Sequence, residues 1–221
     1  MTAESRKRGV RVFQNPILDW SSRAHPATPA LIWVPIIFAS WYLAVQKGQA
    51  WWTVLLLTVA GFVLWTLFEY ILHRWIFHFV PEKESLRPSY YMVHQIHHDY
   101  HEWDRLVAPP MMSLTLGVFF YVLLRVTLGP SYVWPVFAGV AIGYLAYDYS
   151  HFYQHFGKPK SRWAKMLRRR HFQHHTTYPD RWYGVSSPFW DYVFGTDVKK
   201  GERPTRKGAE DIDWNPRIYE D

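Results

Sequence analysis

Ten of the twelve histidines in this chain fall into four tightly spaced blocks, and imidazole nitrogen is a common metal ligand. The blocks read HRWIFH, HQIHH, HFYQH and HFQHH, and they contain His73, His78, His94, His97, His98, His151, His155, His171, His174 and His175. On a helix, positions i, i+3 and i+4 share one face, so each HxxHH block is expected to present three imidazoles in a single direction. His73 and His78 would lie about 140° apart on an ideal helix. They therefore either serve different metals or stand on the two sides of a helix end.

The number and type of these side chains indicate a site for two redox-active ions. Imidazole suits iron, copper and zinc, whereas magnesium and calcium prefer oxygen ligands. The absence of cysteine excludes thiolate sites. Ten ligands exceed the needs of one ion and suit two ions that keep open positions. Cleavage of an unactivated C–H bond needs a redox metal that activates O₂, and the blocks are typical of that chemistry.

Four apolar runs, each without Asp, Glu, Lys or Arg, predict a membrane-embedded helical protein. They are Ala30–Val45, Trp51–Phe68, Leu106–Leu124 and Tyr132–Tyr147. Short links at 46–50 and around Gly129 join them into two hairpins. The runs are a little shorter than the roughly 20 residues that cross a bilayer, so hairpins that only partly penetrate it stay an alternative, as does a soluble helical bundle. The expected fold class is all-α, an integral membrane protein with four transmembrane helices.

The distribution of charge predicts the side from which the hairpins enter the membrane. If both hairpins enter and leave by the same face, that face carries 23 of the 25 lysines and arginines, all except Lys47 and Arg125, and positively charged segments stay cytosolic. Hairpins at about 30–68 and 106–147 and a cytosolic helical cap at about 69–105 and 148–221 would form one domain, 1–221. Since two histidine blocks directly follow apolar runs, the dimetal site is expected in this cap, just under the membrane. The net charge of +7 is assigned to an anionic lipid surface, with no nucleic-acid partner.

The order of the histidine blocks, HX4H, HX2HH, HX3H and HX2HH, resembles the fatty acid hydroxylase superfamily. The surrounding segments narrow the resemblance to relatives of the fatty acid 2-hydroxylases, over roughly residues 65–196. The most specific segments are FEYILHRWIFH from Phe68, RLVAPP from Arg105, YDYSHFYQH from Tyr147 and GVSSPFWDYVFGT from Gly184. The histidine order alone also fits sterol oxidases and carotenoid hydroxylases.

This resemblance implies a monooxygenase of lipid metabolism that uses two iron ions, O₂ and two electrons to hydroxylate an acyl chain at C2. The ten histidines would hold the iron, and zinc can replace it in a purified protein. Two other functions stay open: a desaturase or a sterol or carotenoid oxidase with the same metals, and a metal-binding membrane protein without catalytic activity.

The electrons are expected to come from a separate protein. Some relatives carry a fused cytochrome b5 domain, and the 29 residues before the first apolar run are too few to form one. The donor would be of the cytochrome b5 or ferredoxin type. Basic cap residues, including Arg168, Arg169 and Arg170, would either dock such an acidic donor or bind anionic headgroups.

Two carboxylates are candidates for supporting the metal ligands. Glu69 lies four residues before His73, and Asp148 lies three before His151. If the helices continue, each can accept the second ring N–H of a ligating imidazole. The alternatives are an interfacial charge for Glu69 and a helix cap for Asp148.

Three further positions are less defined. Tyr147 and Asp104 enter through the resemblance alone, as pocket residues. His101 lies where the resemblance leads us to expect a proline. It is interpreted as a solvated or supporting residue and not as an additional ligand.

Overall fold

The computed structural model consists of helices, and the residues that it describes form no strand. It describes residue 13 and residues 15–80, 82–83, 86, 94, 96–99 and 102–203, so His101 lies outside the described residues. The elements are α1 (Pro16–Ser21), α2 (Thr28–Gln46), α3 (Trp51–Ile71), η1 (Leu72–Phe77), α5 (Ile96–Asp99), α6 (Pro110–Phe156), α7 (Arg162–Thr176) and α8 (Phe189–Phe194). The predicted all-α class is confirmed over these residues.

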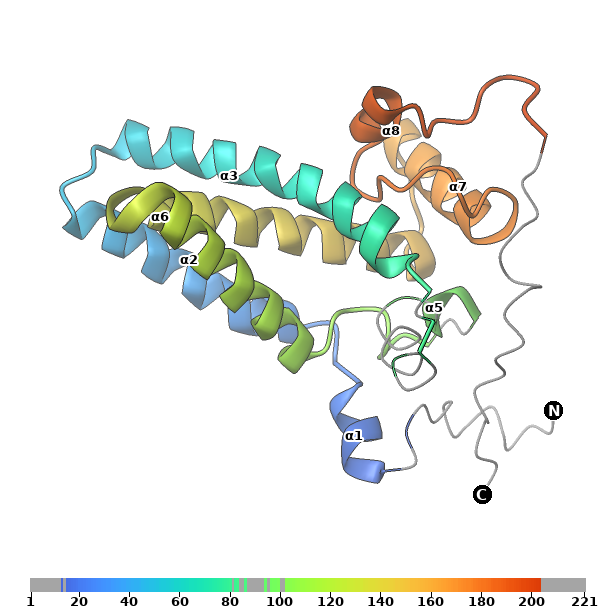
Figure 1. Ribbon diagram of the computed structural model, residues 1–221, viewed down its shortest axis with the longest axis horizontal. Coiled ribbons are helices and arrows are strands. Elements are labelled where there is room, and N and C mark those ends of the chain that lie inside the picture. The colour runs from blue at the N-terminus through green and yellow to red at the C-terminus, as the bar shows by residue number, and fades with distance from the viewer. Residues whose placement is uncertain are drawn as a thin grey trace.

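Three of the helices are long and apolar enough to cross a membrane, namely α2, α3 with its continuation η1, and α6. Helices α2 and α3 and the two arms of α6 run side by side, and α5, α7 and α8 gather at one end of this bundle (Figure 1). Most of the side chains on the bundle surface are apolar, because the helices carry almost no charged residues. The protein is therefore a helical membrane protein with a polar region at one end of its apolar bundle.

Helix α6 begins within the third apolar run, contains the whole of the fourth, and bends sharply at Gly129. The φ and ψ angles there are 74° and −180°, a combination that favours glycine, and Pro130 begins the second arm. The ring of Tyr121 contacts those of Trp134 and Phe137, with centroids 5.2 and 5.6 Å apart, and these contacts join the two arms. The two arms lie where the third and fourth helices were predicted, and the non-helical residue Gly129 separates them.

The second arm of α6 packs closely against α3 because glycines face each other where the two cross. A Cβ atom on Gly61 would lie 2.1 Å from the carbonyl oxygen of Val136, and one on Gly139 would lie 2.0 Å from that of Thr58. Large aromatic side chains fill the space around this crossing, among them Trp33, Trp65, Phe120 and Tyr144. The packing fixes the ends of α3 and α6, which carry two of the histidine blocks.

Candidate metal centre

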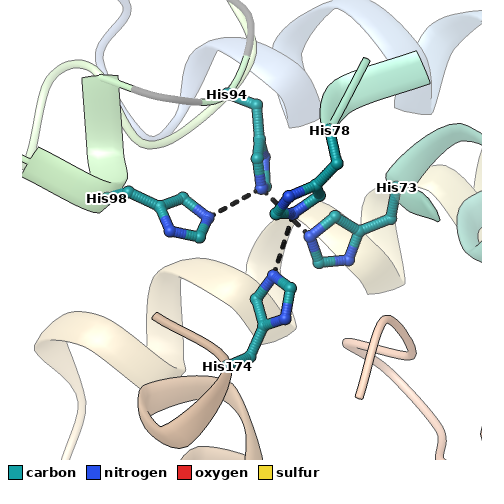
Figure 2. Close-up of side chains that lie close together, drawn as sticks. All are labelled: His73, His78, His94, His98 and His174. Atoms are coloured by element: carbon teal, nitrogen blue, oxygen red, sulfur yellow. Dashed lines mark hydrogen bonds between the residues drawn. The ribbon is translucent and has the colours of Figure 1, made fainter. Parts of the chain in front are cut away.

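The structure brings the ten histidines together in two groups of five. The first group contains His73, His78, His94, His98 and His174, and the second contains His97, His151, His155, His171 and His175. Within each group, one ring nitrogen per residue lies within 4.8 Å of those of the other members. Figure 2 shows the imidazoles of the first group pointing toward one another from separate segments. The two groups adjoin, since the rings of His98 and His175 stack with centroids 3.9 Å apart.

Each HxxHH block divides between the two groups. His94 and His98 belong to the first group and His97 to the second, whereas His171 and His175 belong to the second and His174 to the first. On a helix, positions i and i+4 are about 40° apart, but positions i+3 and i+4 are about 100° apart. One helix face can therefore serve two neighbouring centres. The prediction that the three imidazoles of each block point in a single direction is therefore wrong, because each block divides between the two groups.

The first block is brought together by a change of helix type. Segment η1 is a π-helix, in which hydrogen bonds join residues five apart, and His78 forms its C-cap. A spacing of five therefore places His73 and His78 on one side, and both belong to the first group. Their placement in one group favours a shared ion over the alternative in which they serve different metals. The helix does end between them, at Phe77.

Burial keeps the imidazoles in the neutral form that binds metals. Loss of hydration lowers the pKa of His78 to about 3 and that of His174 to about 4. Burial, followed by the charge of neighbouring imidazoles, lowers the pKa of His94, His97, His98 and His171 well below its usual value. These rings therefore have no proton to release before they can bind an ion at neutral pH.

Two backbone carbonyls determine which ring nitrogens face the interior of the first group. The Nδ1 atom of His73 lies 2.6 Å from the carbonyl oxygen of Tyr183, and that of His174 lies 2.6 Å from the carbonyl oxygen of Arg181. Because a carbonyl only accepts, both Nδ1 atoms carry the proton and both Nε2 atoms present a lone pair. Histidines that bind metals are commonly oriented in this way. No sequence pattern indicates these contacts, since a carbonyl occurs at every residue.

The inward nitrogens form clusters that hydrogen bonding alone does not satisfy. The Nε2 atom of His94 lies 3.0 Å from that of His73 and 2.8 Å from that of His98, and the Nε2 atom of His171 lies 2.8 Å from that of His155 and 2.9 Å from that of His175. A neutral ring nitrogen offers either one proton or one lone pair, so each central nitrogen forms at most one well-aligned hydrogen bond. A cation within each group would be bound by these lone pairs. The donor set therefore fits ions such as iron or zinc.

A largely apolar pocket adjoins the histidines. Its apolar walls include Trp65, Leu72, Met112 and Leu116. His97 and His151 also line the pocket, and their Nε2 atoms are buried with no hydrogen-bond partner among the described residues. A hydrocarbon chain can thus lie directly against the candidate metal ligands.

Glu69 is buried beside the first group, but its carboxylate binds a loop and not the imidazole of His73. Oε1 accepts hydrogen bonds from the backbone N–H groups of Val185, at 2.8 Å, and Ser186, at 2.7 Å, and Oε2 accepts one from the Ser186 hydroxyl. The same loop supplies the carbonyl of Tyr183. Glu69 therefore supports His73 only through this loop, whereas we expected its carboxylate to accept the ring N–H of His73 directly.

The other predicted candidates lie in or near the pocket. Asp148 accepts hydrogen bonds from the backbone of Ala108 and the hydroxyl of Tyr144, both at 3.3 Å. Tyr147 lines the pocket together with Asp148, and its ring lies parallel to that of His151. The Asp104 carboxylate lies outside this lining and forms an ion pair of 2.8 Å with Arg23.

The three arginines of α7 differ in their contacts. Arg170 pairs with Asp197 at 2.9 Å and donates to the hydroxyl of Tyr192 at 2.7 Å. Arg168 donates to the carbonyl of Gly157, whereas Arg169 is exposed. Two of the three side chains are thus already engaged within the protein.

Sequence and structure comparisons both match this chain to hydroxylases. Residues 58–196 match the fatty acid hydroxylase family. The chain is 33% identical to the dihydroceramide fatty acyl 2-hydroxylase FAH2 of Arabidopsis thaliana, over 85% of this chain and 80% of that protein. It is 32% identical to the fatty acid 2-hydroxylase of Rattus norvegicus, over 89% of this chain and 59% of that protein. A solved structure described as full-length scs7p, with only the hydroxylase domain visible, is similar with a TM-score of 0.80 and 31% identity, covering 88% of this chain and 74% of that one.

Proposed function

The chain belongs to the fatty acid hydroxylase family and is a lipid-hydroxylating oxidoreductase, and we propose that it hydroxylates the acyl chain of a lipid at C2 with O₂ and a pair of iron ions. The observation that carries this proposal is the pair of adjoining five-histidine groups beside an apolar pocket. The names of the relatives, which are 2-hydroxylases of fatty acids and of dihydroceramide fatty acyl groups, support the position of attack.

The two groups of histidines would each hold one ion, so that all ten serve as ligands. Bound iron would supply the redox chemistry by which O₂ cleaves a C–H bond. Zinc accepts the same nitrogen ligands and can take the place of iron in a purified protein. The contribution of the chain is to keep the rings buried and neutral and to orient them through the carbonyls of Tyr183 and Arg181.

The acyl chain would follow the apolar pocket away from the histidines. A second, narrower cavity shares Trp65, Leu116 and Tyr144 with the first and extends to Phe120 in the bundle. The first pocket also has polar lining groups at the histidine end, including Asp148 and Tyr147. We place C2 at that end and the remaining methylene groups along the first arm of α6.

Hydroxylation requires a supply of electrons. One oxygen atom of O₂ enters the C–H bond and the other leaves as water, so two electrons and two protons come from outside the substrate. A separate carrier of the cytochrome b5 or ferredoxin type would provide the electrons. Since Arg168 and Arg170 are engaged internally, Arg169 is the residue of the three that we expect to contact an acidic carrier.

We further propose a single membrane-bound domain over residues 1–221, in which α2, α3 and each arm of α6 cross the bilayer. The helical cap and its metal centre would face the cytosol. The concentration of lysine and arginine on the side of the cap supports this orientation.

Lipid analysis of cells that express the chain under ¹⁸O₂ tests this function. The proposal predicts acyl chains with ¹⁸O in a hydroxyl group at C2, and none in cells that express a His174→Ala variant. New double bonds with unchanged 2-hydroxyacyl content would favour a desaturase. Hydroxylated sterols or carotenoids would assign another activity of the superfamily.

A further inference from the structure

The segment 181–184, between α7 and α8, makes contacts that concentrate on the first histidine group. Its carbonyls at Arg181 and Tyr183 accept the Nδ1 protons of His174 and His73, and both histidines belong to the first group. The position of two ligands of one group therefore depends on the path of this short stretch of backbone.

The backbone of this segment has an unusual conformation. Trp182, the residue between the two carbonyls, has a φ angle of 57°, in the left-handed region that residues with a Cβ atom rarely adopt. Such a conformation persists only where surrounding contacts hold it in place. The backbone N–H of Trp182 donates to the carbonyl of Thr196 at 3.1 Å, and its indole N–H donates to Asp197 at 2.8 Å.

Asp191 is the carboxylate that holds the next two residues. It is fully buried, and its two oxygens accept hydrogen bonds from the backbone N–H groups of Tyr183, at 2.9 Å, and Gly184, at 3.0 Å. The hydroxyl of Thr196 donates to the same carboxylate at 2.7 Å. A Cβ atom on Gly184 would lie 2.1 Å from the carbonyl oxygen of Ser187, so the backbone is tightly enclosed here.

We propose that Asp191 is a positioning residue for the first of the two metal positions, which it controls by holding the Tyr183 carbonyl against His73. The two positions are then unequal, because this clamp acts on ligands of the first group. This inference rests on the proposed metal centre. The inference adds that the binding of one ion can be weakened while the other ion stays tightly bound.

The test is a Zn²⁺ titration of the full-length, metal-stripped protein in detergent, in competition with a chromophoric chelator. Asp191→Asn has nearly the same shape but loses the acceptor for one backbone N–H. We expect two tightly bound equivalents in the wild type. In the variant, one equivalent should bind about 10–100-fold more weakly, the range found when groups that orient metal ligands are removed, while the other is unchanged.

Two further variants make the result decisive. Val133→Ala removes volume from the bundle core at a fully buried position, so it controls for general destabilisation and should bind both equivalents normally. Thr196→Val removes only the hydrogen bond from the Thr196 hydroxyl to the Asp191 carboxylate, which is a milder change. This variant replaces Asp191→Asn if Asp191→Asn does not fold. Wild-type affinity for both equivalents, or equal weakening of both, would overturn the positioning role. Failure of the wild type to bind two equivalents would instead reject the metal centre itself.

Discussion

Replacement of Glu69 by alanine should destabilise the protein strongly, although the Glu69 carboxylate forms no hydrogen bond with a candidate metal ligand. Its carboxylate accepts hydrogen bonds from two backbone N–H groups, that of the buried Val185 and that of the half-buried Ser186. Leaving one such group without a partner costs about 1–3 kcal/mol, so the free energy of unfolding should fall by roughly 2–6 kcal/mol. Glu69→Gln keeps an amide oxygen at the position of Oε1 and should lose much less.

Thermal unfolding of the purified variants, followed by circular dichroism in detergent, measures this difference. Glu202→Ala is the matched control, because Glu202 lies at the surface and is the acceptor for Arg181 and Lys199 instead of for a buried loop. The expected order of stability is wild type, then Glu202→Ala and Glu69→Gln close to it, with Glu69→Ala far below. If Glu69→Ala unfolds at the same temperature as Glu69→Gln, the two backbone hydrogen bonds are not what this carboxylate contributes.

Three other outcomes follow from the structure. Acid should destabilise the metal-free protein, since burial lowers the pKa of His174 from 6.5 to about 4. As the pH falls from 6.5 toward 4, the unfolded chain takes up this proton before the folded protein does, so the free energy of unfolding decreases, by about 2 kcal/mol for this residue at pH 5. Unfolding measured at about pH 7.5 and pH 5 tests this difference. Equal stability at both pH values would contradict it. Leu116→Trp should obstruct the passage between the two cavities and shift the products toward shorter acyl chains in a lipid profile, whereas an unchanged chain-length distribution would show that the chain takes another path. Gly139→Ala should cost about 1–3 kcal/mol by forcing α6 away from the Thr58 carbonyl, and a melting temperature equal to that of the wild type would refute this close packing.

The sequence predicted the helical class and the gathering of the histidines because both depend on local pattern. Apolar runs without charges form helices in a membrane, and blocks with a helical period place imidazoles on shared faces. The chain reversal at Gly129 was also visible in the sequence as a turn, and the structure has non-helical backbone angles at this residue.

The details that give the candidate centre its geometry depend on neighbours that no local pattern identifies. The widening of the helix at Leu72–Phe77 places His73 and His78 in one group, and an ideal helix would have separated them. The partner of Glu69 is a loop more than 100 residues away in the chain, so spacing alone pointed to His73 instead. Asp191 lies within GVSSPFWDYVFGT, and its place in that segment was the only sequence signal for its role.

The metal content of the purified full chain tests whether each group of five histidines binds one ion. After loading with ferrous iron without oxygen, elemental analysis should find two ions per chain in the wild type. A variant that lacks His73 should retain the ion of the second group, and one that lacks His151 should retain that of the first. One ion or none in the wild type, or two ions in both variants, would contradict the assignment of one metal to each group of five histidines.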